Sequence, residues 1–270
     1  MAHGQRVDVG GYHLYVESAG TGSPTVIFEC GMECGAASLA NLGAEVQQFT
    51  HTVLYDRAGL GQSDPAPTPR TAQDIVNDLH QLLAQAQIAG PYLLVGHSFA
   101  GLPLRLFAHQ FPDEVVGLVL LDVVHPDQWL RELQLLPPPS PDEPAAITKA
   151  RNVFMAEWND PFCNGEGMDI AASAAQVRAT GHLGQLPLVV ITAGIDEWDE
   201  GFPLEVARAL EANWLAMQKE LVALSHNSTH IIATESDHSI QDCQPALVVD
   251  VIHQLVQDIR AGRAAEETSA

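Results

Sequence analysis

The chain has 270 residues, and its 34 Asp and Glu against 12 Lys and Arg give a formal net charge of -22 at pH 7. This charge excludes a nucleic-acid binder, which needs a basic face to neutralise phosphates, and it disfavours binding to anionic membranes. Hydrophobic residues make up 46% of the chain, which suits a packed core of one domain or of one domain with an insertion.

Targeting signals and cysteines give a consistent prediction of the compartment. The first ten residues hold no apolar run of the kind found in signal peptides, and no stretch reaches the ~18 apolar residues of a membrane helix. The four cysteines are too few for a disulfide framework and form no C-x-x-C zinc motif. We therefore expect a cytoplasmic protein with no membrane partner, no metal and no cofactor.

Short β-branched runs alternate with longer segments of helical periodicity along most of the chain. We expect strands at residues 12–17, 25–28, 52–55, 92–95, 115–121, 188–192 and 230–233. Helical spacing of apolar residues predicts helices at 74–89, 98–109, 204–224 and 245–259, with a frayed tail after residue 261. This alternation predicts an α/β fold, in which a mostly parallel central sheet carries helices on both faces.

The alternation breaks between residues 123 and 186, where five prolines fall within residues 137–144. We predict a small helical cap at 123–186, inserted into a core formed by residues 1–122 and 187–270. Ten apolar residues of the insertion would suit a hydrophobic acyl or aromatic group, or would pack the cap onto the core. They are Trp129, Leu130, Leu133, Leu135, Leu136, Phe154, Met155, Trp158, Phe162 and Met168.

The strongest chemical signal is a buried strand that runs through Gly96, His97 and Ser98 into a helix. At such a nucleophile elbow the chain turns sharply at the serine, so the residues two before and two after it must be small. Here they are Gly96 and Ala100. An N-capping serine would explain Ser98 but not its small neighbours, so Ser98 is the predicted nucleophile.

A serine nucleophile needs a base, and the predicted base is His238. It follows the last expected strand, and loops at the carboxyl ends of parallel strands meet at one edge of a sheet. Two carboxylates compete for the third role, because Asp122 and Asp196 each follow a strand at that edge. Residue patterns alone leave this choice open.

The predicted oxyanion hole consists of two backbone N–H groups. One belongs to Phe99, directly after the nucleophile, and the other to Met32, in the loop that follows the strand at 25–28.

These segments resemble the α/β-hydrolase superfamily over nearly the whole chain. The resemblance rests on Cys30-Gly31, on the segment 55–64 with its Gly-x-Gly-x-Ser pattern, on the elbow, and on Ser236-Asp237-His238. The segment 121–128, followed by Trp214, Gln218 and 224–228, is similar to a subgroup of uncharacterised small hydrolases. In that subgroup the Asp at the end of the sixth strand recurs, which implies Asp122 as the acid and leaves Asp196 as the alternative.

The expected activity is a serine hydrolase that cleaves carboxylic esters of small, neutral, hydrophobic substrates through an acyl-enzyme. The same triad would also support lactone hydrolysis, C–C bond hydrolysis or perhydrolysis. A ligand receptor on a hydrolase fold, with little turnover, is the alternative of another class. Superfamily members that act on epoxides and haloalkanes use an Asp nucleophile, so Ser98 argues against both. The expected partner is the ester itself, and a homo-oligomer is compatible with the sequence.

Overall fold

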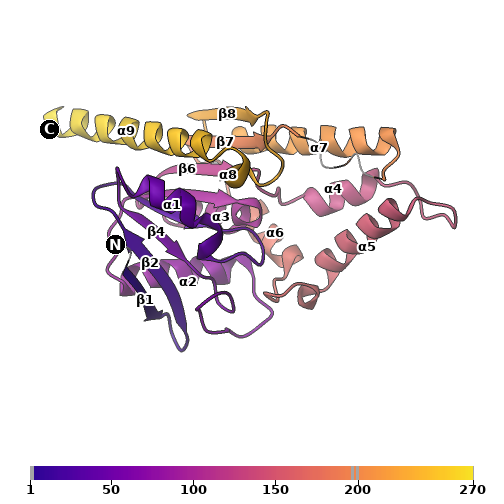
Figure 1. The fold of residues 1–270 in the computed structure, drawn as a ribbon, viewed down its shortest axis with the longest axis horizontal. Helices are drawn as coiled ribbons and strands as arrows, with labels where there is room; N and C mark the ends of the chain where they lie inside the picture. Colours follow the sequence, from indigo (N-terminus) through magenta and orange to yellow (C-terminus); the bar gives the residue numbers. More distant parts are fainter. Residues whose placement is uncertain (1–2, 196–197, 199–200, 270) are drawn as a thin grey trace.

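A computed structural model describes residues 3–195, 198 and 201–269 (Figure 1). Among these residues, eight strands form one sheet in the order β1-β2-β4-β3-β5-β6-β7-β8. The strands are β1 His3–Asp8, β2 His13–Ala19, β3 Thr25–Glu29, β4 Thr52–Tyr55, β5 Tyr92–His97, β6 Val115–Leu121, β7 Leu188–Ala193 and β8 Ser228–Ala233. Only the β1–β2 and β2–β4 pairs are antiparallel. The predicted α/β fold with a mostly parallel sheet is confirmed.

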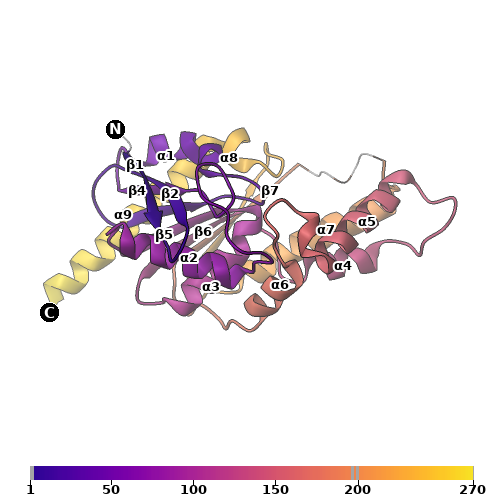
Figure 2. The same ribbon diagram turned by 90° about the horizontal axis from the view of Figure 1, so that it is seen from below.

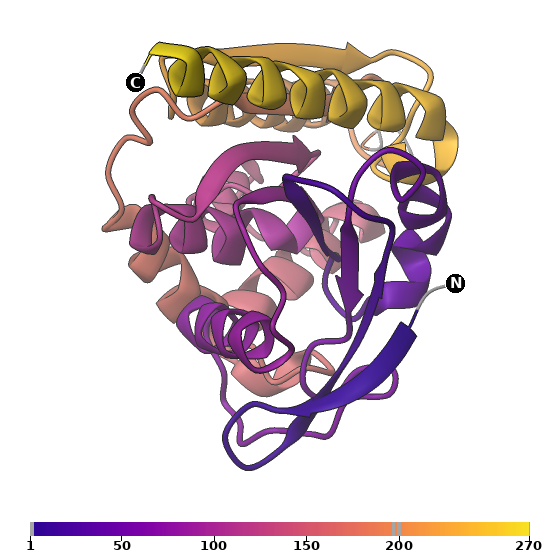
Figure 3. The same ribbon diagram turned by 90° about the vertical axis from the view of Figure 1, so that its left-hand side faces the viewer.

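Helices cover both faces of this sheet, as Figure 3 shows end-on, with yellow α9 along the top and α2 and α3 on the left below it. The α-helices are α1 Ala40–Val46, α2 Ala72–Gln85, α3 Gly101–Gln110, α4 Gln128–Leu135, α5 Ala145–Asn159, α6 Ile170–Arg178, α7 Leu204–Val222, α8 Ile240–Cys243 and α9 Pro245–Ser269. Side chains of α1 and α9 belong to one apolar cluster, and those of α2, α3 and α6 to the other.

The central strands divide their side chains between these two clusters residue by residue. On β3, Val26 and Phe28 face α1 and α9 while Ile27 faces the other side, and on β5 the same division separates Val95 from Leu94. Successive side chains of a strand point to opposite faces. A strand covered on both faces therefore becomes apolar throughout, which is the pattern that the sequence shows.

The segment between β6 and β7 contains α4, α5, a short 3-10 helix and α6, and no strand among its residues. Together with α7, helices α4 and α5 extend beyond the strands on the right of Figures 1 and 2. The proline-rich residues 136–144 connect α4 to α5 without regular structure. The assignment of residues 123–186 to a separate cap remains a prediction. Helix α7, which we assigned to the core, packs against both α4 of this segment and β7 of the sheet.

The structure differs from the sequence-based expectations at β1, α1, α8 and α9. The edge strand β1 was not expected, since its residues are mostly polar, and α1 is too short for helical periodicity to show. Helix α9 continues to Ser269 rather than fraying after residue 261, and the Ala- and Glu-rich stretch 264–267 favours helix by intrinsic propensity. No helix in the described part of the chain combines the length and apolar content that a membrane span requires.

Candidate active site

The predicted site residues follow neighbouring strands at one edge of the sheet. Ser98 comes directly after β5, which lies between β3 and β6. The loop after β3, residues 30–34, is called the oxyanion loop below, and Asp122 comes directly after β6. His238 lies in the loop after β8. Parallel strands end at the same edge, so this strand order places Ser98 between the oxyanion loop and Asp122.

The turn at Ser98 is strained and tightly packed. Ser98 has φ of 55°, a left-handed conformation that few non-glycine residues adopt. A Cβ atom placed on Gly96 would lie 2.8 Å from the Cβ of Ala100 and 2.5 Å from a methyl carbon of Leu104. Because these contacts are closer than carbon atoms tolerate, the position two before Ser98 admits glycine alone, as the elbow pattern requires.

Asp122 accepts hydrogen bonds on both carboxylate oxygens. Its Oδ2 lies 2.7 Å from Nδ1 of His238, and its Oδ1 accepts from the Ala193 N–H at 3.0 Å and from Nε1–H of Trp214 at 3.1 Å. Asp122 is 3% exposed and also has a left-handed φ, 44°. The carboxylate is therefore fixed by the backbone of β7 and by α7, with one oxygen directed at the imidazole.

The alternative acid, Asp196, lies outside the described residues, so its role stays a prediction. The residues just before it are bound to residues 234–239, the loop that carries His238 and that is called the histidine loop below. The N–H groups of Gly194 and Ile195 both donate to the Ser236 carbonyl, at 3.1 and 3.0 Å. Within that loop, Asp237 accepts a hydrogen bond from the Ser239 N–H at 2.8 Å. These contacts hold the histidine loop against the end of β7.

His97 supports the histidine loop from below. Its Nε2–H donates to the His238 carbonyl over 2.9 Å, and the centroids of the two rings are 4.6 Å apart. Burial, with a smaller effect of the neighbouring His238, lowers the pKa of His97 to about 4. The neutral His97 ring can therefore hold the loop without placing a second positive charge beside His238.

The oxyanion loop packs closely against Ser98, the predicted nucleophile. A Cβ on Gly31 would lie 3.3 Å from the Cβ of Ser98 and 3.2 Å from Nδ1 of His97. Within the described residues, the N–H of Met32 donates to no acceptor of the protein. Phe99, which carries the other predicted donor, is 2% exposed.

Ser98, Asp122 and His238 line one pocket of about 210 Å³. The other lining residues are Val124, Gln128, Ala193, Ile195, Trp198, Glu211 and Trp214. None of the ten apolar residues that we singled out in the insertion lines this pocket. Trp129, Phe154 and Met168 are buried in packing instead, while Met155 and Phe162 are exposed. Apart from Ser98, Asp122 and His238, the wall of this small pocket consists of two tryptophans, three aliphatic side chains and the polar Gln128 and Glu211.

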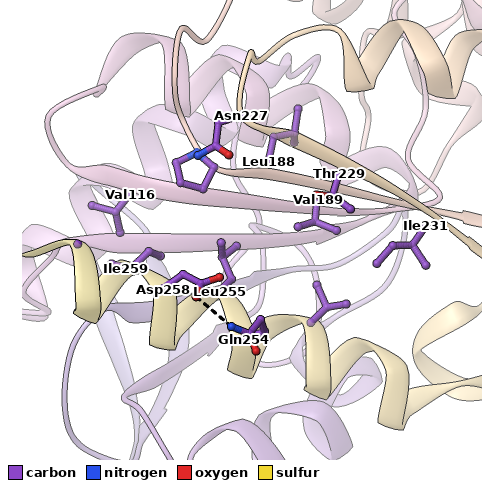
Figure 4. Close-up of a pocket in the computed structure, with 13 residues that line it drawn as sticks. Val116, Leu188, Val189, Asn227, Thr229, Ile231, Gln254, Leu255, Asp258 and Ile259 are labelled. Atoms are coloured by element: carbon purple, nitrogen blue, oxygen red, sulfur yellow. Dashed lines mark hydrogen bonds between the residues drawn. The ribbon is translucent and has the colours of Figure 1, made fainter.

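A larger cavity of about 660 Å³ lies elsewhere, between α9 and the strands β6 to β8 (Figure 4). Its lining residues include Val116, Leu188 and Asn227, which lie at or near the amino-terminal ends of these strands. This cavity is thus at the opposite end of the strands from Ser98. It carries none of the predicted catalytic residues.

The described residues contain no group of three or more His, Cys, Asp and Glu side chains arranged to hold a metal ion. The four cysteines carry free thiols, and only Cys30 is buried.

Trp214 and Gln218 belong to the resemblance described above, but the sequence assigned no role in the site to either residue. Trp214 donates to Asp122, and Gln218, one helical turn later on α7, donates to the Val123 carbonyl at 2.8 Å. Their spacing of four places both on one face of a helix, which was the available signal. Neither Arg57 nor Glu166 gave any signal of the contact between them, because 109 positions separate them.

Sequence relatives are mostly uncharacterised. An uncharacterised protein of Bacillus subtilis, YqjL, is 26% identical over 242 residues, which cover 89% of this chain and 85% of the relative. A probable transporter of Hormonema carpetanum, efuK, is 31% identical over 196 residues, which cover 64% of this chain and 28% of that protein. A 2-(acetamidomethylene)succinate hydrolase of Mesorhizobium japonicum is 30% identical over 118 residues, covering 44% of this chain and 42% of the enzyme.

Solved structures share the fold at lower identity. A thermophilic esterase from Thermogutta terrifontis superposes with a TM-score of 0.62 and 18% identity, covering 96% of this chain and 99% of the esterase. A haloalkane dehalogenase variant from Bradyrhizobium elkanii superposes with a TM-score of 0.70 and 16% identity, and the alignment covers 98% of this chain and 100% of the dehalogenase. An epoxide hydrolase mutant from Vigna radiata superposes with a TM-score of 0.64 and 14% identity, and the alignment covers 95% of this chain and 99% of the epoxide hydrolase.

These similarities agree with the model of the alpha/beta hydrolase family, which matches residues 20–258. The match spans most of the 270 residues, including the elbow and the loop that carries His238. This chain belongs to the alpha/beta hydrolase family.

Proposed function

We propose that this protein is a serine hydrolase that cleaves carboxylic esters of small substrates through an acyl-enzyme. The observation that carries the proposal is the 2.7 Å distance between Asp122 Oδ2 and His238 Nδ1, at a pocket that Ser98 also lines. A hydrogen bond at Nδ1 leaves Nε2 of the neutral imidazole as the acceptor for the serine proton. Serine, rather than aspartate, at the elbow favours this chemistry over that of the dehalogenases and epoxide hydrolases that share the fold.

The proposed reaction has two halves. Ser98 Oγ attacks the ester carbonyl while His238 takes its proton, and the negative charge on the carbonyl oxygen is met by the N–H groups of Met32 and Phe99. His238 then protonates the departing alkoxide. In the second half, His238 takes a proton from water, the resulting nucleophile attacks the acyl-enzyme, and Ser98 recovers its proton as the acid leaves. Asp122 orients the ring and stabilises the imidazolium in both halves.

Size and charge narrow the proposed substrate class. A pocket of about 210 Å³ is smaller than the ~300–1,000 Å³ of typical small-molecule sites, which favours short esters. The net charge of -22 slows the approach of anionic substrates. Glu211 in the pocket wall adds to this effect. We therefore propose neutral esters of small acids, held between Trp198 and Trp214, with residues 123–186 acting as the cap.

A panel of p-nitrophenyl esters of increasing acyl length tests this proposal. We expect a burst of p-nitrophenol followed by steady turnover that is fastest for the short esters, and loss of both in Ser98→Ala. A fluorophosphonate should label the protein at Ser98 alone, as peptide mass spectrometry would show. Tight ligand binding without turnover would instead favour the receptor alternative, and turnover that survives Ser98→Ala would contradict the proposal.

A further inference from the structure

The Arg57 guanidinium lies behind the oxyanion loop, and each of its five N–H groups meets an acceptor. Its side chain is 4% exposed, and those of Glu29 and Glu166 are 1% and 2% exposed. Nε and Nη2 donate to the two oxygens of Glu166 over 2.7 and 2.6 Å, and Nη1 donates to Glu29 over 2.6 Å. The remaining two N–H groups donate to backbone carbonyls, to Cys30 at 2.8 Å and to Gly31 at 2.6 Å.

The contact with the Gly31 carbonyl fixes the direction of a catalytic donor. That carbonyl and the Met32 N–H belong to the same planar peptide unit, and in a trans peptide the two groups point in opposite directions. Holding the Gly31 oxygen at Arg57 therefore turns the Met32 N–H away from Arg57. Gly31 itself packs against Ser98, so the direction of this N–H decides whether it can meet an oxyanion formed at Ser98.

Glu166 brings the insertion between β6 and β7 into the same arrangement. Besides its two bonds from Arg57, its Oε1 accepts the Glu33 N–H at 2.6 Å. In return, the Glu33 carboxylate accepts the Gly165 N–H at 2.6 Å. The peptide units on both sides of Met32 are thus held, one by Arg57 and the next by Glu166. A bidentate pair of this kind fixes direction as well as distance.

Arg57 also reaches the second proposed donor. Its guanidinium carbon lies 5.8 Å from the ring centroid of Phe99, whose N–H follows the nucleophile. The arginine is in turn anchored from below, because Glu29 accepts the hydroxyl proton of Tyr55. One buried cation therefore contacts the chain around both halves of the proposed oxyanion hole.

We propose that Arg57 and Glu166 are positioning residues that aim the Met32 N–H at the oxyanion, so that the insertion contributes to the oxyanion hole as well as covering the pocket. This inference rests on the proposed function. A positioning role predicts a loss in kcat with little change in KM, since an oxyanion donor acts on the transition state and not on the bound ester. A role in stability alone predicts a lower unfolding temperature with kcat unchanged.

The test compares Arg57→Lys, Glu166→Gln and the control Arg70→Lys. Lysine offers one nitrogen and cannot meet five acceptors, so we expect kcat to fall by about 100-fold in Arg57→Lys, near the ~10²–10³ seen on removal of one oxyanion donor. Glu166→Gln keeps an acceptor for the Glu33 N–H, so we expect its kcat to fall by only about tenfold. Arg70 also forms a buried ion pair, with Asp78 at 2.5 Å, and its replacement should lower stability while leaving kcat within twofold.

Thermal unfolding sets an assay temperature at which all variants are folded. A folded Arg57→Lys with unchanged kcat overturns the inference, and so does an equal loss in Arg70→Lys. A crystal structure of Glu166→Gln or Arg57→Lys provides a measurement independent of the substrate. We expect the Gly31–Met32 peptide to be rotated, and an unchanged peptide in both variants contradicts the proposal. If instead the wild type shows no hydrolysis that depends on Ser98, the proposed function fails, while the peptide orientation still decides whether Arg57 and Glu166 set it.

Discussion

Glu132 carries a completely buried carboxyl group. It lies on α4 with 0% of its surface exposed, and among the described residues its Oε1 has no hydrogen-bond partner. Its other oxygen lies 3.5 Å from the amide nitrogen of Gln128, a weak contact. Burial raises the pKa of Glu132 from 4.5 to about 8, and the nearby Glu157 contributes to the rise. Glu132 is therefore mostly protonated in the folded protein at pH 7.

This raised pKa makes stability depend on pH in a defined direction. The unfolded chain releases the Glu132 proton near pH 4.5, whereas the folded chain keeps it up to about pH 8. The stabilisation that comes from the protonated group is fully present below pH 4.5 and is lost as the pH rises to about 8. Each pKa unit corresponds to ~1.4 kcal/mol of unfolding free energy, so the rise in pKa from 4.5 to about 8 corresponds to a loss of about 5 kcal/mol over this pH range.

Replacing Glu132 by glutamine removes this titration while keeping a similar shape. We expect urea unfolding of both proteins at pH 5, 6, 7 and 8 to show that the free energy of unfolding of the variant, relative to that of the wild type, rises by ~1 kcal/mol per pH unit. The total rise from pH 5 to 8 should be ~3–4 kcal/mol. Glu220→Gln is the control of opposite sign, because a hydrogen bond from Arg131 lowers the pKa of Glu220, so its removal costs stability above pH 4.5. A difference between wild type and Glu132→Gln that stays constant from pH 5 to 8 would refute the assignment.

Three further predictions concern the site and its scaffold. Asp122→Asn should lower kcat by up to ~10⁴, the loss known when the analogous residue of a serine protease is changed, while Asp196→Asn should have a mild effect; equal mild losses in steady-state assays would remove both from the triad. Trp214→Phe keeps the pocket wall but deletes a hydrogen bond to Asp122, and kcat should fall about tenfold while urea unfolding changes little; an unchanged kcat would show that the bond has no catalytic role. Gly96→Ala forces a methyl group against Leu104, so we expect ~1–3 kcal/mol of destabilisation by urea unfolding together with lost activity, and a fully stable, active variant would contradict the packing argument.

Local sequence patterns were sufficient for most of the sheet. The expected strands 52–55 and 115–121 coincide with β4 and β6, because a strand covered on both faces must be apolar along its whole length. The elbow was equally clear, since the contacts around Gly96 are with Ala100 and Leu104, which are close to it in the sequence. In contrast, β1 pairs through its backbone at an edge of the sheet, where side chains need no pattern.

The contacts that decide the site's geometry join distant parts of the chain. Sequence alone determined that Ser98 and His238 end up at one edge of the sheet and left two carboxylates as candidates. Only the tertiary structure brings Asp122 to His238 across 116 positions, and Arg57 to Glu166 across 109. It also lines the pocket with residues of α7 and of the loop after β7, and with none of the ten apolar residues that the sequence singled out in the insertion. The physical reason is that hydrogen bonds between distant charged groups leave no periodic trace in a sequence, whereas burial on a strand or helix does.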